Sequence, residues 1–115
     1  MTLKDNHINY VEFKANDLES IKEFYSQSFG WTFTDYGPDY TAFSDSGLNG
    51  GFERTESSIV TGALVVLFHS NLESIKNKVI HSGGIISKDI FPFPGGRRFH
   101  FVDPTGNELA VWSNS

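Results

Sequence analysis

The stretch LESIK occurs twice in this sequence, at residues 18–22 and again at residues 72–76. The residues before it repeat as well, because the run YVEFKA at 10–15 stands in the same register before the first copy as LVVLFH at 64–69 before the second. Both runs have the aromatic and β-branched composition of strands. An internal repeat of this kind indicates one supersecondary unit that is built twice and packed against its own copy.

Each copy is predicted to form a strand, a helix and three further strands. Short runs bounded by Gly, Pro, Asp and Asn predict the later strands at 31–36, 40–44, 49–54, 85–90, 97–102 and 107–112. Neither copy can bury its helix and sheet face alone, so the two are expected to join. We therefore predict a single α+β domain over residues 1–115, with βαβββ modules at about 8–54 and 63–113. The expected architecture is one curved mixed sheet with both helices on its outer face and a trough on the other.

The helices are predicted from their caps and from the spacing of their apolar residues. The first begins at Asn16 or Asp17 and the second at Ser70 or Asn71, because such side chains accept hydrogen bonds from the first turn. Apolar residues recur at helical spacing along one face of each segment: Leu18, Ile21, Tyr25 and Phe29, then Leu72, Ile75 and Val79.

Composition excludes several classes of function. The chain has no cysteine, so it has neither a disulfide framework nor a thiolate metal site. A formal net charge of −5 argues against a nucleic-acid partner, which requires a basic face. No apolar run approaches the length of a membrane span, and the first residues lack the pattern of a secretory signal. These features predict a cytoplasmic protein that binds neither membrane nor nucleic acid.

The paired βαβββ pattern, together with FYSQSFGW at the end of the first helix and DPTGNELAVW at the last strand, resembles the vicinal oxygen chelate superfamily. This superfamily contains glyoxalase I, bleomycin-resistance proteins and extradiol dioxygenases. The segments NGGFER and FPGGRRFHF are most similar to its small glyoxalase-like bacterial branch. The resemblance implies the fold described above and a homodimer, whereas a shared fold does not by itself fix the chemistry.

The resemblance also implies where a divalent metal would bind, through His, Glu or Gln side chains. The corresponding positions here are Tyr10 and Leu64 on the first strands, and Ala110 and Gly51 (or Gly50) on the last strands. None of these side chains is a suitable ligand. We therefore expect no cofactor, and the alternative is a displaced metal site built from Glu12, His100 and Glu108.

Alternation along the strands predicts which residues line the trough. Glu12 and His100 are the candidate catalytic residues, since a carboxylate among aromatics or a histidine suits acid–base chemistry. The structural alternatives are a salt bridge from Glu12 to Lys14, Arg98 or His100, and a hydrogen-bonded sheet residue at His100. The expected ligand-binding residues are Tyr10, Lys14, Leu64, Val66, Phe68, Arg98, Glu108, Ala110 and Trp112.

Three functions are compatible with this trough. The favoured one is a protein that binds a small, partly apolar molecule without a metal. The alternative is a glyoxalase-like lyase or isomerase that uses the displaced metal site or acid–base chemistry by Glu12. The third is a partner-binding module whose trough is closed by a second subunit.

Overall fold

The two predicted modules are present in the computed structural model, which describes residue 5 and residues 8–60 and 62–115. The first module consists of β1 (Val11–Ala15), α1 (Leu18–Phe29), β2 (Thr32–Asp35), β3 (Tyr40–Ser44) and β4 (Gly50–Arg54). The second consists of β5 (Val65–Phe68), α2 (Leu72–His81), β6 (Ile85–Phe93), β7 (Gly96–Val102) and β8 (Glu108–Ser113). The α+β class and the βαβββ order, repeated once, are therefore confirmed.

The strands form two four-stranded mixed sheets, in the orders β1-β4-β3-β2 and β5-β8-β7-β6. This corrects the expectation of one continuous sheet. In each module the first strand pairs in parallel with the last, so β1 and β5 are edge strands. Side chains of both strands, including Val11, Phe13, Val65 and Leu67, line a small hollow between them. The two sheets therefore meet through side chains and not through a hydrogen-bonded ladder.

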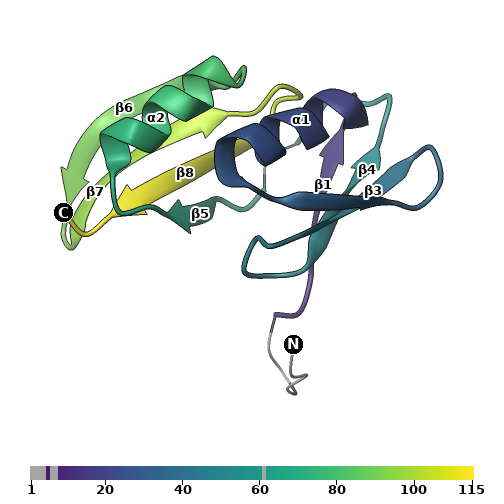
Figure 1. Ribbon diagram of the computed structural model, residues 1–115, viewed down its shortest axis with the longest axis horizontal. Helices are drawn as coiled ribbons and strands as arrows, with labels where there is room; N and C mark the ends of the chain where they lie inside the picture. Colours follow the sequence, from purple (N-terminus) through teal and green to yellow (C-terminus); the bar gives the residue numbers. More distant parts are fainter. Residues whose placement is uncertain (1–4, 6–7, 61) are drawn as a thin grey trace.

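Both helices lie on the same side of the sheets (Figure 1). Asp17 caps α1 by accepting hydrogen bonds from the backbone N–H groups of Glu19 and Ser20, and Asn71 caps α2 through the N–H of Ser74. The second residue of each predicted pair is thus the cap. The apolar helix faces pack on the inner sheet faces, and one core contains Ile21, Phe24, Tyr25, Phe52, Leu72, Ile75, Val79, Phe99, Phe101, Leu109 and Val111.

A buried polar cluster joins the two modules. The Oη of Tyr25 in α1 donates a hydrogen bond of 3.0 Å to Oδ2 of Asp103, in the turn before β8. Asn107 donates to the same carboxylate from its backbone N at 2.9 Å and from Nδ2 at 3.1 Å. Its Nδ2 also donates, at 2.9 Å, to the backbone oxygen of Lys14 in β1. The FY and DPTGN motifs are therefore the two sides of one contact between modules.

The cluster is enclosed, and this affects both of its titratable groups. Tyr25 is fully buried and Asp103 is 2% exposed. Burial raises the pKa of Asp103, while the hydrogen bonds from Asn107, Tyr25 and Thr105 act in the opposite direction. Burial, together with the neighbouring carboxylate, raises the pKa of Tyr25 well above its ordinary value. The tyrosine hydroxyl therefore stays protonated and remains the donor.

The strand β6 is longer than predicted and continues to Phe93. Pro92 pairs in register with Arg97, and β6 is the outer strand of its sheet. A proline is tolerated there because an edge strand does not need every N–H for the ladder. The extension places Phe91 and Phe93 beside β7.

No helix among the described residues is long and apolar enough to cross a membrane.

Replacing Tyr25 by phenylalanine should lower the free energy of unfolding by about 1–2 kcal/mol, because a buried carboxylate loses one donor. Urea denaturation monitored by circular dichroism measures this change. The matched control is Tyr36→Phe, since Tyr36 is 66% exposed and its hydroxyl makes no hydrogen bond to the described residues. Equal stability of the two variants would contradict a stabilising role for the Tyr25 hydroxyl.

Candidate functional site

The sheet face opposite the helices, here called the open face, carries the predicted site residues. Phe99 and Phe101 of β7 are fully buried in the core, so Arg98 and His100 lie on the open face. On β8 the buried Leu109 and Val111 alternate with Glu108, Ala110 and Trp112, which share that face. On β5, Val66 and Phe68 are 41% and 53% exposed, and Leu64 before the strand is 40% exposed.

The register of the second sheet places these residues in two adjacent rows. Val66, Ala110, His100 and Lys88 follow one another across β5, β8, β7 and β6. The next row contains Phe68, Trp112, Arg98 and Phe91. The second row is thus an aromatic strip interrupted by one cation.

The aromatic strip borders a shallow pocket of about 390 Å³. The Trp112 ring lies 5.2 Å from the Phe68 ring and 6.3 Å from the Phe93 ring, with edge-to-face geometry in both pairs. This pocket size falls within the range of small-molecule sites. The pocket is lined by Val66, Phe93, Pro94, Gly95, Arg98 and Trp112.

Arg98 lies between two phenylalanine rings in this pocket. Its Cζ is 5.3 Å from the centroid of Phe91 and 5.5 Å from that of Phe93. Both distances are within the range of a cation–π interaction. Its Nε is buried and has no hydrogen-bond partner among the described residues. The guanidinium is therefore close to two rings and has no counter-charge among the described residues.

His100 and Glu108 form a second polar group on this face. Nδ1 of His100 lies 3.4 Å from Oε2 of Glu108, and the same Oε2 accepts a hydrogen bond of 2.9 Å from Oγ of Ser87. The His100 side chain is 7% exposed, and its Nε2 is buried with no partner among the described residues. A carboxylate beside one imidazole nitrogen orients the ring. The other nitrogen is then the one that an acid–base role would use, and in this structure it is buried without a partner among the described residues.

The predicted residues Tyr10, just before β1, and Glu12 and Lys14, in β1, belong to a separate cluster on the first sheet. Tyr10 and Tyr40 share a hydrogen bond between their hydroxyl groups. Lys14 is paired with Glu53, and its Nζ lies 3.6 Å from Oε2 of Glu12. Burial raises the pKa of Tyr40, and its hydrogen bond with Tyr10 adds to the rise.

Glu12 has the salt-bridged environment that was one of its two interpretations. Its side chain is 43% exposed, and Lys14 is one of the ion-pair partners expected for it. Glu12 and Glu108 both line a crevice of about 150 Å³ between β1 and β8. His100 does not line this crevice. Glu108 therefore lies beside His100 and shares a crevice with Glu12, but the three residues do not line one common site.

The positions at which the resemblance implies metal ligands do not fit a metal. Glu12 of β1 pairs in register with Gly51, as Val66 of β5 pairs with Ala110. This register makes Gly51, and not Gly50, the equivalent of Ala110. A Cβ added to Gly51 would lie 2.5 Å from the Tyr40 Oη, so Tyr40 fills the space that a ligand side chain would need.

The displaced metal site also lacks a common centre in this structure. Within residues 8–60 and 62–115, no three His, Asp or Glu side chains are close enough together to hold a metal ion. Glu12, His100 and Glu108 are therefore not gathered into one cluster.

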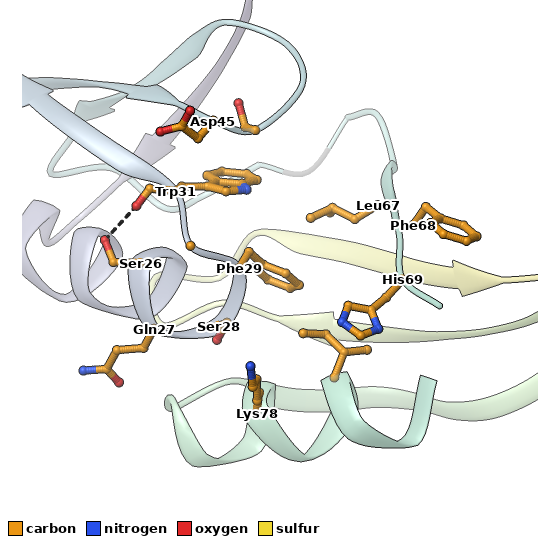
Figure 2. Close-up of a pocket in the computed structure, with 13 residues that line it drawn as sticks. Ser26, Gln27, Ser28, Phe29, Trp31, Asp45, Leu67, Phe68, His69 and Lys78 are labelled. Atoms are coloured by element: carbon orange, nitrogen blue, oxygen red, sulfur yellow. Dashed lines mark hydrogen bonds between the residues drawn. The ribbon is translucent and has the colours of Figure 1, made fainter. Parts of the chain in front are cut away.

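Another hollow, of about 510 Å³, lies at the end of α1 and beside α2 (Figure 2). Two of its polar residues have structural roles, because Asp45 accepts a hydrogen bond from Thr32 and His69 accepts one from the N–H of Asn71. Phe68 is the one predicted site residue that lines it. This hollow does not bring the other predicted residues together.

Sequence reasoning missed four residues of the open face: Tyr40, Ser87, Phe91 and Phe93. The alternation of Ile90, Phe91, Pro92 and Phe93 was the available signal for the aromatic pair, and the prolines made that stretch look like a loop. Tyr40 and Ser87 gave no signal, because their partners are distant in the sequence.

Comparison with known proteins adds a family match. The profile of the Glyoxalase/Bleomycin resistance protein/Dioxygenase superfamily matches residues 7–111. No curated protein has a sequence that matches this chain.

Solved structures share the fold at low sequence identity. An enzyme of the glyoxalase/bleomycin resistance protein/dioxygenase family from Burkholderia phytofirmans PsJN gives a TM-score of 0.81 at 14% identity, over 93% of this chain and 98% of that chain. A mutant of the fosfomycin resistance protein FosX from Listeria monocytogenes, in complex with Mn(II) and 1S,2S-dihydroxypropylphosphonic acid, gives 0.82 at 14% identity, over 97% and 93%. TioX from Micromonospora sp. ML1 gives 0.73 at 15% identity, over 96% and 100%. Identities this low establish the fold alone.

The two tryptophans should differ in their access to solvent. Trp31 is 6% exposed in the core, whereas Trp112 lines the open pocket. Acrylamide should therefore quench the emission of Trp31→Phe, which retains Trp112, more strongly than that of Trp112→Phe. The opposite order of quenching would show that the aromatic strip is covered in solution.

Proposed function

The chain belongs to the Glyoxalase/Bleomycin resistance protein/Dioxygenase superfamily, and from this premise we propose that it binds a small, partly apolar molecule on the open face of its second sheet. The observation that carries the proposal is a group of three apolar side chains on neighbouring strands, here called the apolar trio: Val66, Phe68 and Trp112. The trio borders a pocket, and Phe68 is 53% exposed. Single exposed apolar residues are ordinary on protein surfaces, whereas contiguous ones on neighbouring strands mark binding sites.

The proposal includes binding without a divalent metal at the position used elsewhere in the superfamily. Two observations support it. Gly51 and Ala110 offer no ligand atoms, and the hydroxyl of Tyr40 fills the space beside Gly51. Ala110 is itself fully buried in its row between Val66 and His100.

A neutral planar probe, cinnamyl alcohol, tests binding at the apolar trio of Val66, Phe68 and Trp112. We expect a saturable shift of the Trp112 indole N–H signal in a ¹H–¹⁵N spectrum, with the Trp31 signal unchanged. Val66→Glu should weaken binding at least tenfold, because a carboxylate beside a bound apolar group loses its hydration. The matched control is Ile80→Glu on α2, since Ile80 is similarly exposed, at 47%, and lies outside the pocket. Equal weakening by the two variants would contradict this binding site.

Metal content is tested separately. The protein is incubated with Ni²⁺, Zn²⁺, Mn²⁺ and Fe²⁺ in turn, desalted, and analysed by elemental mass spectrometry. We expect occupancy far below one ion per chain, because the aligned positions lack ligand side chains. Retention of about one ion per chain would overturn the metal-free part of the proposal.

A second candidate function is a lyase or isomerase of the glyoxalase type, and the His100–Glu108–Ser87 group favours it. In such an enzyme Glu108 orients the ring, and Nε2 of His100 transfers a proton to or from the substrate. The test is turnover of the hemithioacetal of methylglyoxal and glutathione. If the protein is active, His100→Gln should lower kcat by roughly 10²–10⁴-fold, while Glu12→Gln should leave it within a factor of a few. An unchanged kcat in His100→Gln would remove this assignment.

We also propose a homodimer, which rests on the family resemblance, and a cytoplasmic location, which rests on composition. The partner-binding alternative differs from a simple dimer, since a second subunit would then cover the pocket. Sedimentation velocity of the wild type and of Val66→Glu separates these readings. A dimer that persists in the variant indicates an interface elsewhere on the molecule.

A further inference from the structure

We infer that the natural ligand is an anion, a planar aromatic carboxylate whose charged end is held by Arg98. This inference deepens the proposed function and rests on it, because it concerns the same pocket on the second sheet. It follows from the pairing of the chain's charges, the surroundings of one guanidinium, and the shape of the apolar walls beside it.

The three arginines of the chain differ in their pairing. Arg54 contacts Asp39 at 2.9 Å and Glu56 at 2.6 Å, and Arg97 contacts Glu73 at 2.8 Å. Arg98 makes no ion pair with any carboxylate among the described residues, although the chain has 14 acidic residues and a net charge of −5. In a protein with an excess of carboxylates, an arginine without an ion pair among the described residues has its charge free to bind an external anion.

The surroundings of Arg98 favour an anion over a neutral ligand. Arg98 is partly buried beside Phe91 and Phe93, and its buried Nε has no hydrogen-bond partner among the described residues. A cation that has lost part of its hydration interacts more strongly with an opposite charge. The planar fork of an arginine matches a carboxylate, which can accept two parallel hydrogen bonds.

The remaining walls favour a flat apolar group attached to that carboxylate. Val66, Pro94 and Trp112 line the pocket together with Phe93 and Arg98. Trp112 meets its two phenylalanine neighbours edge to face, at 69° for Phe68 and 65° for Phe93. Aromatic rings bind other planar groups by offset stacking or edge contacts. A ligand of cinnamate size would place its ring by Trp112 and its carboxylate by Arg98.

The competing interpretation is that Arg98 only holds the β6–β7 hairpin together by packing between its two rings. The two interpretations differ in what they predict for a pair of isosteric probes. A packing role predicts equal affinity for a carboxylate and for its neutral amide. An anion-binding role predicts a preference for the carboxylate that depends on Arg98.

The experiment is a titration of the wild-type protein with cinnamate and with cinnamamide, followed at the Trp112 and Trp31 indole signals in a ¹H–¹⁵N spectrum. We expect cinnamate to shift the Trp112 signal and to bind at least tenfold more tightly than cinnamamide. Arg98→Gln should reduce this ratio to about one, and Arg98→Lys should retain part of it. Arg97→Gln is the matched control, because it removes the same charge from the adjacent residue and should keep the preference.

Each outcome separates this inference from the proposed function. Equal binding of both probes to the wild type overturns the anionic ligand and leaves the apolar pocket intact, and this comparison needs no variant to fold. A preference that survives in Arg98→Gln overturns the role of Arg98. If cinnamate and cinnamamide both leave Trp112 unshifted while cinnamyl alcohol shifts it, only the anionic ligand fails. If none of the three probes shifts it, the proposed pocket fails as well.

Discussion

The contact between Tyr25, Asp103 and Asn107 is the interaction on which the relative placement of the two modules depends. In the part of the chain that the structure describes, the two sheets share no hydrogen-bonded ladder. Side-chain packing between them is less directional than hydrogen bonds. The buried carboxylate adds directional contacts, since it accepts from α1 of one module and from the turn of the other. Asn107 extends these contacts to the backbone of β1. A carboxylate that accepts hydrogen bonds from fixed donors tolerates little displacement. The buried polar cluster therefore defines how the two open faces are oriented.

The two copies have kept the same backbone and acquired different open faces. On the first sheet this face is polar and filled, with Tyr40 over Gly51 and Lys14 between two carboxylates. On the second sheet it is aromatic and hollow, with one guanidinium between rings. The difference arises at matching positions, because Glu12 and Val66 each pair with the equivalent residue of the last strand. The open face of the first copy is therefore filled by its own side chains, whereas that of the second copy carries a shallow pocket.

Most of the fold could be predicted because its signals are local. The caps at Asp17 and Asn71 and the alternation of β7 depend on residues a few positions apart. The LESIK repeat is a direct match between two stretches of the sequence and needs no knowledge of how they pack. The separation into two sheets could not be predicted, since it depends on how the edges of β1 and β5 meet. For the candidate site, strand alternation predicted which residues share a sheet face, but not which of them lie together in one cluster. Alternation placed Arg98 on the open face, whereas its aromatic neighbours come from a strand extension through Pro92 that the sequence pattern disguised.

The proline in β6 has a further consequence, for solubility. A nine-residue outer strand would offer an unpaired row of N–H and C=O groups to the edge of another sheet. Pro92 lacks one of those donors, the register shifts on either side of Lys88, and Lys88 and Asp89 place charges along the same edge. Such features make an edge a poor template for adding a strand from another chain. The hairpin that carries the aromatic rings therefore also protects the protein against edge-to-edge aggregation.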